Sequence, residues 1–268
     1  MFRCPFFWVD AFTMGPFTGN PAGVCPLPAW PADDLLQKIA HQNGLAETAF
    51  YVPEAAGRFR LRWFTPTVEI DLCGHATLAS AHVLFAEQGY KQEEVTFTTK
   101  AGDLVVTQGA QDQLVLDFPS RPATPVPVAD VPSPLLAALG LTADDIIWAG
   151  LARDWLLVLS DESRLVAVAP DFAAMSTLDT AAVILTAPGQ EVDFLSRFFA
   201  PNFGVPEDPV TGSAHCTLIP YWAERLQSNR LTALQRSARG GKLWGERHGD
   251  RVTIGGYAKT YIAGSLVL

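Results

Sequence analysis

The sequence predicts an α+β fold of two similar, pseudo-symmetric lobes, each a mostly antiparallel sheet with one central helix. Strand-like segments mostly follow one another along the chain, and each half holds one long apolar helix, which is typical of α+β folds. The chain also repeats itself: residues 62–66 (RWFTP) and 197–201 (RFFAP) begin 135 residues apart, and Gly74 and Gly212 lie 138 residues apart. Both spacings are close to half of the 268 residues. We therefore expect two copies of one strand–turn–helix unit, related by a pseudo-two-fold axis.

Length and composition fit this organisation and exclude several classes of protein. A chain of 268 residues is long enough for two lobes of about 130 residues each. Hydrophobic residues make up 49% and charged residues 18%, as in a well-buried globular protein. A net charge of −9 without a run of Lys or Arg argues against nucleic-acid binding. The uncharged stretch 11–32 contains five prolines and cannot be a membrane-spanning helix.

The first half is expected to contain a helix at residues 33–40, with Asp33 as its N-cap, after a turn-rich loop at 15–21. Residues 76–88 form a second predicted helix, which has no polar face and should be central and buried, and Gly89 ends it. Strand patterns cover residues 2–12, 24–27, 47–52, 58–64, 95–99, 103–108 and 113–117.

The second half repeats this style after a proline-rich segment. Residues 119–134 hold six prolines and predict a linker between the lobes. Helices are expected around 171–176 and over 213–226, and strands over 146–151, 155–159, 182–186, 192–200, 242–244, 251–255 and 257–268. The lobes are therefore residues 1–120, to which the strand 257–268 is a candidate addition, and residues 121–256.

Each half places a glycine at the start of its long helix, at Gly74 and at Gly212. The first amides of a helix are unpaired and lie at the positive end of its dipole, so they can bind an anion. Glycine lets a ligand approach the backbone closely. If the pseudo-two-fold holds, both helix starts face one cleft that suits a small carboxylate. The alternative is that both glycines only permit tight turns.

Glu47 is the carboxylate whose surroundings best suit general acid/base chemistry. It lies in the apolar stretch 45–50 (LAETAF), where burial would favour a carboxyl group that can hold and release a proton. The competing interpretation is an exposed glutamate on the polar side of a strand edge. The local sequence alone favours this second interpretation, because perturbed carboxylates are a minority.

Three further side chains lie at or near the two glycines. His75 follows Gly74 directly and is either a ligand to a substrate oxygen or a structural histidine. Asp208 precedes a proline, where it is either part of a turn or an acceptor at the rim of the cleft. Ser213 is a helix cap, a substrate contact, or both.

The remaining motifs give no support to a metal or a cofactor. The four cysteines have no spacing typical of a disulfide framework or a zinc site, which with the short N-terminal apolar run favours a cytoplasmic protein. No second His or Cys stands at ligand spacing, so we expect no metal. The chain has neither a dinucleotide-binding glycine fingerprint nor a phosphate-binding loop, and we expect no cofactor.

Taken together, these segments resemble the PhzF-like isomerases of phenazine biosynthesis, a branch of the diaminopimelate-epimerase-like fold. The similarity is carried, in the family's order, by residues 9–21 (VDAFT and PFTGNP), 46–50 (AETAF), 60–66 (RLRWFTP), 71–77 (DLCGHAT) and 207–214 (EDPVTGSA). The resemblance implies two lobes, each a curved sheet wrapped around a central helix, with the active site between them. It also implies proton transfer between substrate carbons without a cofactor.

By this resemblance Glu47 matches the family's proton-transferring glutamate, and His75, Asp208 and Ser213 match residues that contact the substrate. Asn20 is a weaker substrate-binding candidate. Related racemases carry a cysteine at each helix start. This chain has Cys73 at the first, whereas Thr211 stands opposite it in the repeat, which disfavours a two-thiol racemase. A helix start can still make Cys73 reactive.

The sequence therefore predicts a cofactor-independent isomerase that moves a proton on a small carboxylate substrate. Glu47 acts as acid/base, while His75 and Asp208 hold polar groups of the substrate. Gly74, Gly212, Ser213, Cys73 and Asn20 are expected to contact it. The alternatives are an amino-acid epimerase that uses Cys73, and a carboxylate-binding protein without activity, because sites diverge on retained folds. Among oligomers, a homodimer is favoured by the prevalence of two-fold symmetry.

Overall fold

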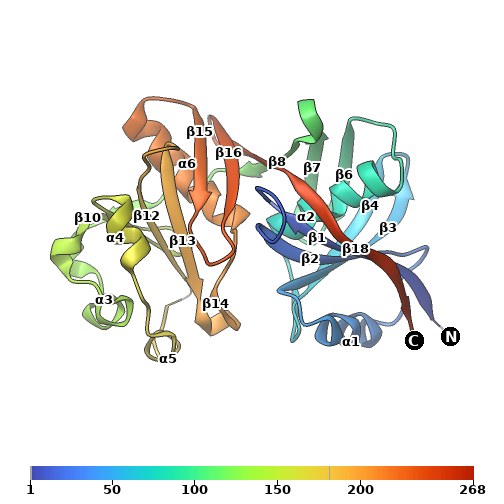
Figure 1. Ribbon diagram of the computed structural model, residues 1–268, viewed down its shortest axis with the longest axis horizontal. Helices are drawn as coiled ribbons and strands as arrows, with labels where there is room; N and C mark the ends of the chain where they lie inside the picture. The colour runs from blue at the N-terminus through green and yellow to red at the C-terminus, as the bar shows by residue number, and fades with distance from the viewer. Residues whose placement is uncertain (1, 181) are drawn as a thin grey trace. The chain divides into compact units, whose positions relative to one another are not determined.

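The structure is a computed structural model that describes residues 2–180 and 182–268. The chain separates into two compact units, which Figure 1 shows in their secondary structure. The N-terminal unit comprises the chain up to Phe118 together with Thr253–Leu268, and the C-terminal unit is Pro119–Val252. The sequence predicted that the N-terminal lobe ends at residue 120 and that the C-terminal lobe ends at residue 256.

The N-terminal unit is a mixed sheet built around one buried helix. Along the sheet the strands are ordered β18–β1–β2–β3–β4–β6–β7–β8, with β2/β3 and β4/β6 parallel and the other pairs antiparallel; β5 adds to β4. These strands are β1 Arg3–Ala11, β2 Asn20–Pro26, β3 Glu47–Ala55, β4 Arg58–Phe64, β5 Glu69–Ile70, β6 Glu94–Thr99, β7 Gly102–Gln108, β8 Leu114–Pro119 and β18 Ala258–Val267.

The C-terminal unit repeats this order of pairings. Its strands run β9–β10–β11–β12–β13–β15–β16, with β11/β12 and β13/β15 parallel and the other pairs antiparallel; β14 adds to β13 as β5 adds to β4. These strands are β9 Thr124–Val126, β10 Ile146–Leu151, β11 Trp155–Leu159, β12 Val183–Pro188, β13 Phe194–Ala200, β14 Val205–Glu207, β15 Arg230–Gln235 and β16 Gly241–His248, followed by β17 Arg251–Gly256. The expected duplication is therefore present in the topology.

The helix α2 (Gly74–His82) occupies the interior of the N-terminal unit. Its residues from Gly74 to Ala81 are all buried, because small side chains let the surrounding strands approach it closely. The sequence predicted one helix over 76–88. In the structure α2 begins at Gly74 and continues as a π-helical turn, Val83–Glu87, in which the Gln88 amide donates to the Val83 carbonyl. Gly89 follows with φ +65°, as expected for a helix stop.

The helix α1 (Asp33–Asn43) forms where the apolar pattern predicted it, but the expected N-cap is wrong. Ala32 is the N-cap and Asp33 is already the first helical residue. The Asp33 carboxylate accepts a hydrogen bond from Arg62 at 2.8 Å, and this ion pair replaces the capping interaction. As an acidic residue in the first turn, Asp33 still interacts favourably with the helix dipole.

The proline-rich segment 119–134 is not an irregular linker. It contains β9, a 3₁₀ turn at Val128–Asp130 and the start of α3 (Ser133–Leu139), and β9 pairs with β10. Prolines are tolerated in an edge strand and in the first turn of a helix, where Pro134 lies, because neither position needs their missing N–H groups. The sequence also missed α3, α4 (Glu162–Ala167) and β15.

The remaining helices are α5 (Phe172–Met175), at the position expected, and α6 (Gly212–Leu226). Asp171 caps α5 by accepting from the Ala174 amide at 2.9 Å. The long helix α6 buries ten of its fifteen residues, including the stretch from Ala214 to Pro220. It is the counterpart of α2, and the two helices begin at the glycines that the sequence repeat predicted.

Candidate active site

Glu47 and His75 meet inside the N-terminal unit. Glu47 is the first residue of β3, and His75 is the second residue of α2. Glu47 Oε2 lies 3.0 Å from His75 Nε2, and the two side chains are only 13% and 6% exposed. The interpretation of Glu47 as an exposed residue on a strand edge is therefore wrong. The two atoms face each other, so Glu47 and His75 form a nearly buried carboxylate–imidazole pair.

The other ring nitrogen of His75 faces two polar groups. The Asn20 side-chain amide donates to Nδ1 at 3.2 Å, and Cys73 Sγ lies 3.5 Å from the same atom. Because Nδ1 accepts from Asn20, the neutral imidazole carries its hydrogen on Nε2, toward Glu47. In a protonated imidazole both nitrogens carry hydrogens, and an Asn20 amide turned to present its oxygen would accept from Nδ1. Asn20 thus orients the histidine, a role that the sequence did not predict.

Burial and neighbouring acidic groups set the protonation of this cluster. Burial is the largest influence on His75 and disfavours its charged form, but Cys73 and Glu47 together outweigh it and raise the pKa of His75 above its ordinary value. Burial also raises the pKa of Cys73, and the nearby Glu47 carboxylate raises it further. The Glu47 carboxylate therefore favours both a charged His75 and a neutral Cys73 thiol.

Glu47, Cys73 and His75 also place ligand atoms within 4.8 Å of one another, which raises the question of a metal. The Glu47 carboxylate faces Nε2, whereas Cys73 faces Nδ1 on the other side of the ring. A zinc ion bound to either nitrogen would need its other ligands within about 2.0–2.3 Å of itself. A metal would use only one of the two nitrogens, so these three residues form a possible ligand set, one short of the four ligands of a structural zinc site. The expected absence of a metal stays a prediction.

The second group of predicted residues lies at the start of α6. Asp208 follows β14, and its carboxylate accepts a short hydrogen bond from the Thr211 hydroxyl. Gly212 is the first residue of α6 and is buried, whereas Ser213 is partly exposed. The N-cap is Thr211 rather than Ser213, and it makes no side-chain capping bond. The interpretation of Ser213 as a helix cap is therefore wrong, and its substrate contact stays a prediction.

Gln235 holds this loop in place, and no sequence pattern pointed to it. It ends β15 and is 1% exposed. Its Nε2 donates to the Asp208 carbonyl at 2.7 Å and to the Thr211 hydroxyl at 3.1 Å, while its Oε1 accepts from the Thr211 amide at 2.8 Å. A glutamine at a strand end carries no sequence signal, so only the tertiary structure reveals it.

The sequence repeat contains a pair of arginines whose partners repeat as well. Arg62 donates to Glu69 through two bonds of 2.8 and 2.9 Å, and Arg197 donates to Glu207 through two bonds of 2.7 and 3.0 Å. Glu69 and Glu207 are 138 residues apart, like the two helix-start glycines. In each unit a bidentate Arg–Glu pair therefore anchors the chain shortly before the helix start.

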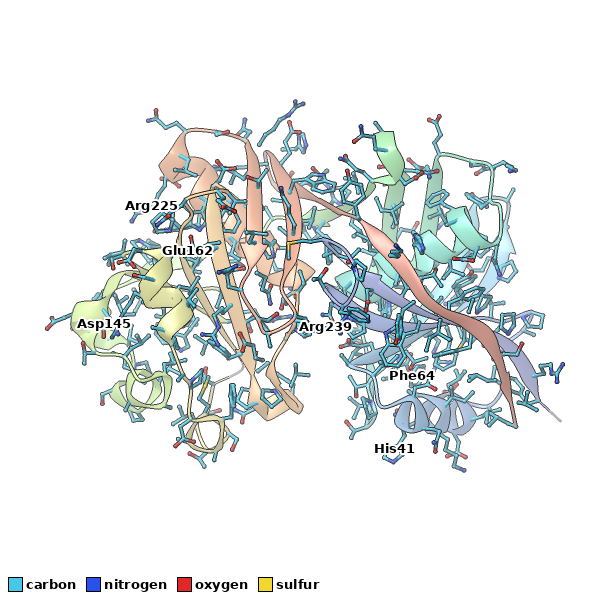
Figure 2. The ribbon with its side chains drawn as sticks, in the orientation of Figure 1. His41, Phe64, Asp145, Glu162, Arg225 and Arg239 are labelled. Carbon is cyan, nitrogen blue, oxygen red and sulfur yellow. The ribbon has the colours of Figure 1, made fainter. Side chains whose placement is uncertain are left out.

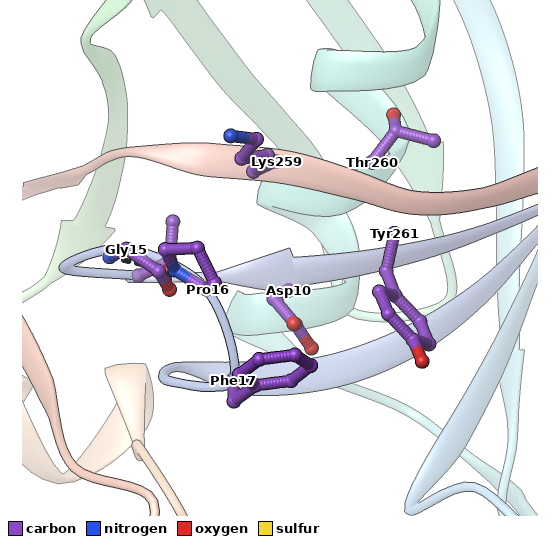
Figure 3. Close-up of a pocket in the computed structure, with 8 residues that line it drawn as sticks. Asp10, Gly15, Pro16, Phe17, Lys259, Thr260 and Tyr261 are labelled. Atoms are coloured by element: carbon purple, nitrogen blue, oxygen red, sulfur yellow. Dashed lines mark hydrogen bonds between the residues drawn. The ribbon is translucent and has the colours of Figure 1, made fainter.

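A shallow hollow in the N-terminal unit lies beside the loop that precedes β2 (Figure 3). Its volume is about 130 Å³, and Phe17 and Tyr261 form part of its wall, with ring centroids 6.3 Å apart. Ligand pockets usually measure about 300–1,000 Å³. The hollow is smaller than this range, and no predicted site residue lines it, so we do not assign it to the candidate active site.

Comparison with known proteins identifies the family. A sequence model described as "Phenazine biosynthesis-like protein" (PhzC-PhzF) matches residues 9–264. The chain belongs to this family. A curated relative in Pseudomonas aeruginosa, named an uncharacterized isomerase, is 49% identical over 98% of both chains. The crystal structure of a PhzF-family phenazine biosynthesis protein from Enterococcus faecalis matches 100% of both chains, with a TM-score of 0.93 and 45% identity.

A predicted epimerase from Pseudomonas aeruginosa shares the fold, with a TM-score of 0.79 over 99% of both chains at 20% identity. The PhzF resemblance, the epimerase-like α+β fold and the isomerase class expected from the sequence are thereby confirmed. Isomerases of this family act on small molecules, so a small-molecule substrate is also supported. Within the described residues, no helix is long and apolar enough to cross a membrane.

The predicted site residues fall into two groups. Asn20, Glu47, Cys73 and His75 come together in the N-terminal unit, at the start of α2 that Gly74 forms, and Asp208, Gly212 and Ser213 lie at the start of α6 in the C-terminal unit. The two helix starts therefore carry the polar clusters expected of them. That both groups act on one substrate stays a prediction.

Proposed function

We propose that this protein is a cofactor-independent isomerase that moves a proton between carbons of a small carboxylate substrate, with Glu47 as the general acid/base. The observation that carries the proposal is the position of the Glu47 carboxylate. It is nearly buried, and its Oε2 lies 3.0 Å from His75 Nε2. A carboxylate held in this way can accept a proton from a carbon acid at close range.

In the proposed reaction Glu47 removes a proton from a substrate carbon next to an electron-withdrawing group. The C–H bond breaks, its electron pair delocalises into that group, and the carboxylate becomes a carboxylic acid. Glu47 then protonates a different carbon, which restores the carboxylate. Between the two steps the acid hydrogen of Glu47 exchanges with solvent, so heavy water labels the substrate. The hydrogen on His75 Nε2 stabilises the negative charge that develops between the two steps.

The substrate carboxylate is proposed to bind the first amides of the two long helices, at Gly74 and at Gly212. These amides are unpaired within their helices and lie at the positive ends of the helix dipoles. The Asp208 carboxylate would accept hydrogen bonds from polar groups of the substrate, and the Ser213 hydroxyl would donate or accept one. A cytoplasmic location and a homodimer stay predictions.

The decisive experiment is a screen of small amino and hydroxy acids for deuterium incorporation from heavy water. Incorporation reports proton removal from carbon even when the product is unknown. We expect at least one small carboxylate to exchange a carbon-bound hydrogen in the presence of the protein. A carboxylate that binds without any exchange would instead support the non-catalytic alternative.

The epimerase alternative rests on Cys73, whose sulfur lies 3.5 Å from His75 Nδ1. Against it stand the raised pKa of the thiol and Thr211 at the corresponding position of the second helix. We expect the exchange rate of Cys73→Ser to stay within about threefold of the wild-type rate. If Cys73 moves the proton, the loss should be about 10²-fold or more. Exchange kinetics in heavy water distinguish these outcomes.

Gln235 should affect turnover through the Asp208 loop. Gln235→Leu removes three hydrogen bonds to Asp208 and Thr211, and we expect kcat to fall roughly 10- to 100-fold through displacement of the loop. Thr186→Val is the matched control. Thr186 is equally buried and hydrogen-bonded, to the Leu195 carbonyl and Trp222, but does not touch the loop. Loss of the Thr186 hydroxyl should lower the melting temperature and leave kcat unchanged. Equal kcat values in both variants would remove the positioning role.

A further inference from the structure

The C-terminal unit contains a cavity of about 460 Å³ away from the candidate active site. It is lined by residues of β9 and the segment before it, β10, the second half of α6, and β16: Pro122, Ala123, Pro125, Trp148, Pro220, Tyr221, Glu224, Arg225 and Arg247. Tyr221 is nine residues beyond Gly212 on α6, which corresponds to about 14 Å along the helix axis. The volume of the cavity lies within the usual range of small-molecule sites, about 300–1,000 Å³.

Pro220 within α6 explains how the segment that begins at Pro122 is held against this helix. A proline lacks the N–H that would bond the carbonyl four residues earlier, and this usually costs about 3 kcal/mol inside a helix. In α6 that carbonyl belongs to Cys216, and it accepts from the Arg121 backbone amide at 2.9 Å. The helix proline therefore frees an acceptor that holds the segment beginning at Pro122 against α6.

An aromatic pair forms the apolar part of the cavity. The rings of Trp148 and Tyr221 have centroids 4.7 Å apart and are inclined by 48°. A Cβ atom on Gly150 would lie only 2.3 Å from the Trp148 ring, so glycine is required for the indole to lie against its own strand. The rings and the three prolines give the cavity rigid walls.

The charged side chains of the cavity favour an anion. Figure 2 labels Arg225, which extends from α6 with its guanidinium 5.1 Å from the centre of the Tyr221 ring. In the part of the chain that the structure describes, neither Arg225 nor Arg247 forms an ion pair with a carboxylate. Glu224 is the one acid of the lining, so two cations face one anion in a protein whose net charge is −9.

The hydroxyl of Tyr221 is the group that points to a ligand. Its oxygen is buried and has no hydrogen-bond acceptor among the described residues. Arg225 can only donate, so it cannot accept the phenolic hydrogen. Burial raises the pKa of Tyr221, which keeps that hydrogen in place. A buried donor without an acceptor costs about 1–3 kcal/mol, and a bound acceptor would recover this.

We propose that this cavity binds a small planar aromatic anion, with its ring against Trp148 and Tyr221 and its acidic group held by Arg225, Arg247 and the Tyr221 hydroxyl. The inference does not depend on the proposed isomerase reaction. Two arginines provide the planar, charge-assisted donors that carboxylates and phosphates prefer. The aromatic pair adds stacking to this charge recognition.

Calorimetric titration of the full-length protein with benzoate tests the proposal, with cyclohexanecarboxylate and inorganic phosphate as probes of ring and charge. We expect benzoate to bind with a Kd of about 1 mM or lower, and the other two anions at least about tenfold more weakly. Arg247→Gln should weaken benzoate binding at least about tenfold, because one charge-assisted hydrogen bond is lost. Lys242 lies on the same strand, with its side chain on the opposite face, so Lys242→Gln should leave benzoate binding unchanged.

Tyr221→Phe provides a second test, in which stability and binding change in opposite directions. Removal of the unsatisfied hydroxyl should raise the melting temperature of the free protein while weakening benzoate binding. Absence of benzoate binding up to about 10 mM would overturn the proposal. So would equal binding by wild type, Arg247→Gln and Tyr221→Phe, or binding that only Asp208→Asn removes, which would place benzoate in the candidate active site. Phosphate binding as tight as benzoate binding would overturn the aromatic specificity.

Discussion

Glu47→Gln is expected to abolish deuterium incorporation into the substrate while leaving the fold intact. General acid/base groups contribute about 10²–10⁴-fold, and a proton shift without another base should lose at least about 10³-fold. Glutamine keeps the shape of the side chain and its contact distance from His75 Nε2, but it cannot accept a proton from carbon. Exchange rates in heavy water, together with circular dichroism and the melting temperature, measure both halves of the expectation.

Two companion variants separate the role of Glu47 from general effects on β3. Glu54→Gln changes an exposed glutamate of the same strand, paired with Arg60 at 3.6 Å, and should leave the exchange rate unchanged. Glu47→Asp keeps the base but withdraws it by one methylene, so exchange should persist at a reduced rate. A Glu47→Gln protein that exchanges hydrogen as fast as wild type would remove Glu47 from the mechanism.

Arg197→Ala should lower the free energy of unfolding by about 3–5 kcal/mol, the usual cost of removing one partner of a buried ion pair. The Arg197 side chain is 10% exposed and bonds both oxygens of Glu207. It also donates to the carbonyls of Val168 at 2.6 Å and Leu165 at 3.3 Å, and its guanidinium lies 4.9 Å from the Phe199 ring centre. Alanine would leave a carboxylate and two carbonyls without these donors.

The other arginine of the repeat is the matched comparison for Arg197. Arg62 is 17% exposed and pairs with Glu69 and the exposed Asp33, and within the described part of the chain no carbonyl accepts a hydrogen bond from its side chain. Solvent can therefore compensate part of its loss, and Arg62→Ala should cost less, about 1–3 kcal/mol. Lys38→Ala breaks a pair whose side chains are 71% and 77% exposed and should cost under about 0.5 kcal/mol. Urea denaturation measures all three; an Arg197→Ala effect no larger than that of Lys38→Ala would contradict the argument.

Much of the fold could be predicted because the chain contains its main unit twice. The strands around Glu47 and Arg62 and the helices at Gly74 and Gly212 were expected from local patterns, since alternation, apolar runs and glycine each act over a few residues. Errors arose where a local pattern has two physical outcomes. Prolines in 119–134 suit a linker, but equally an edge strand and a helix start, and Asp33 suits an N-cap, but equally an ion pair with Arg62.

The sequence by itself determined the duplicated unit, the two helix starts and the residue types that gather at them, because these are properties of short segments and their spacing. Only the tertiary structure decided that Asn20 orients His75, that Glu47 is nearly buried beside it, and that Gln235 holds the Asp208 loop. The physical reason is that burial and hydrogen-bond partners depend on strands that are remote in sequence. Gln235 lies 27 residues beyond Asp208, and Asn20 lies 55 residues before His75, so no local pattern can record either contact.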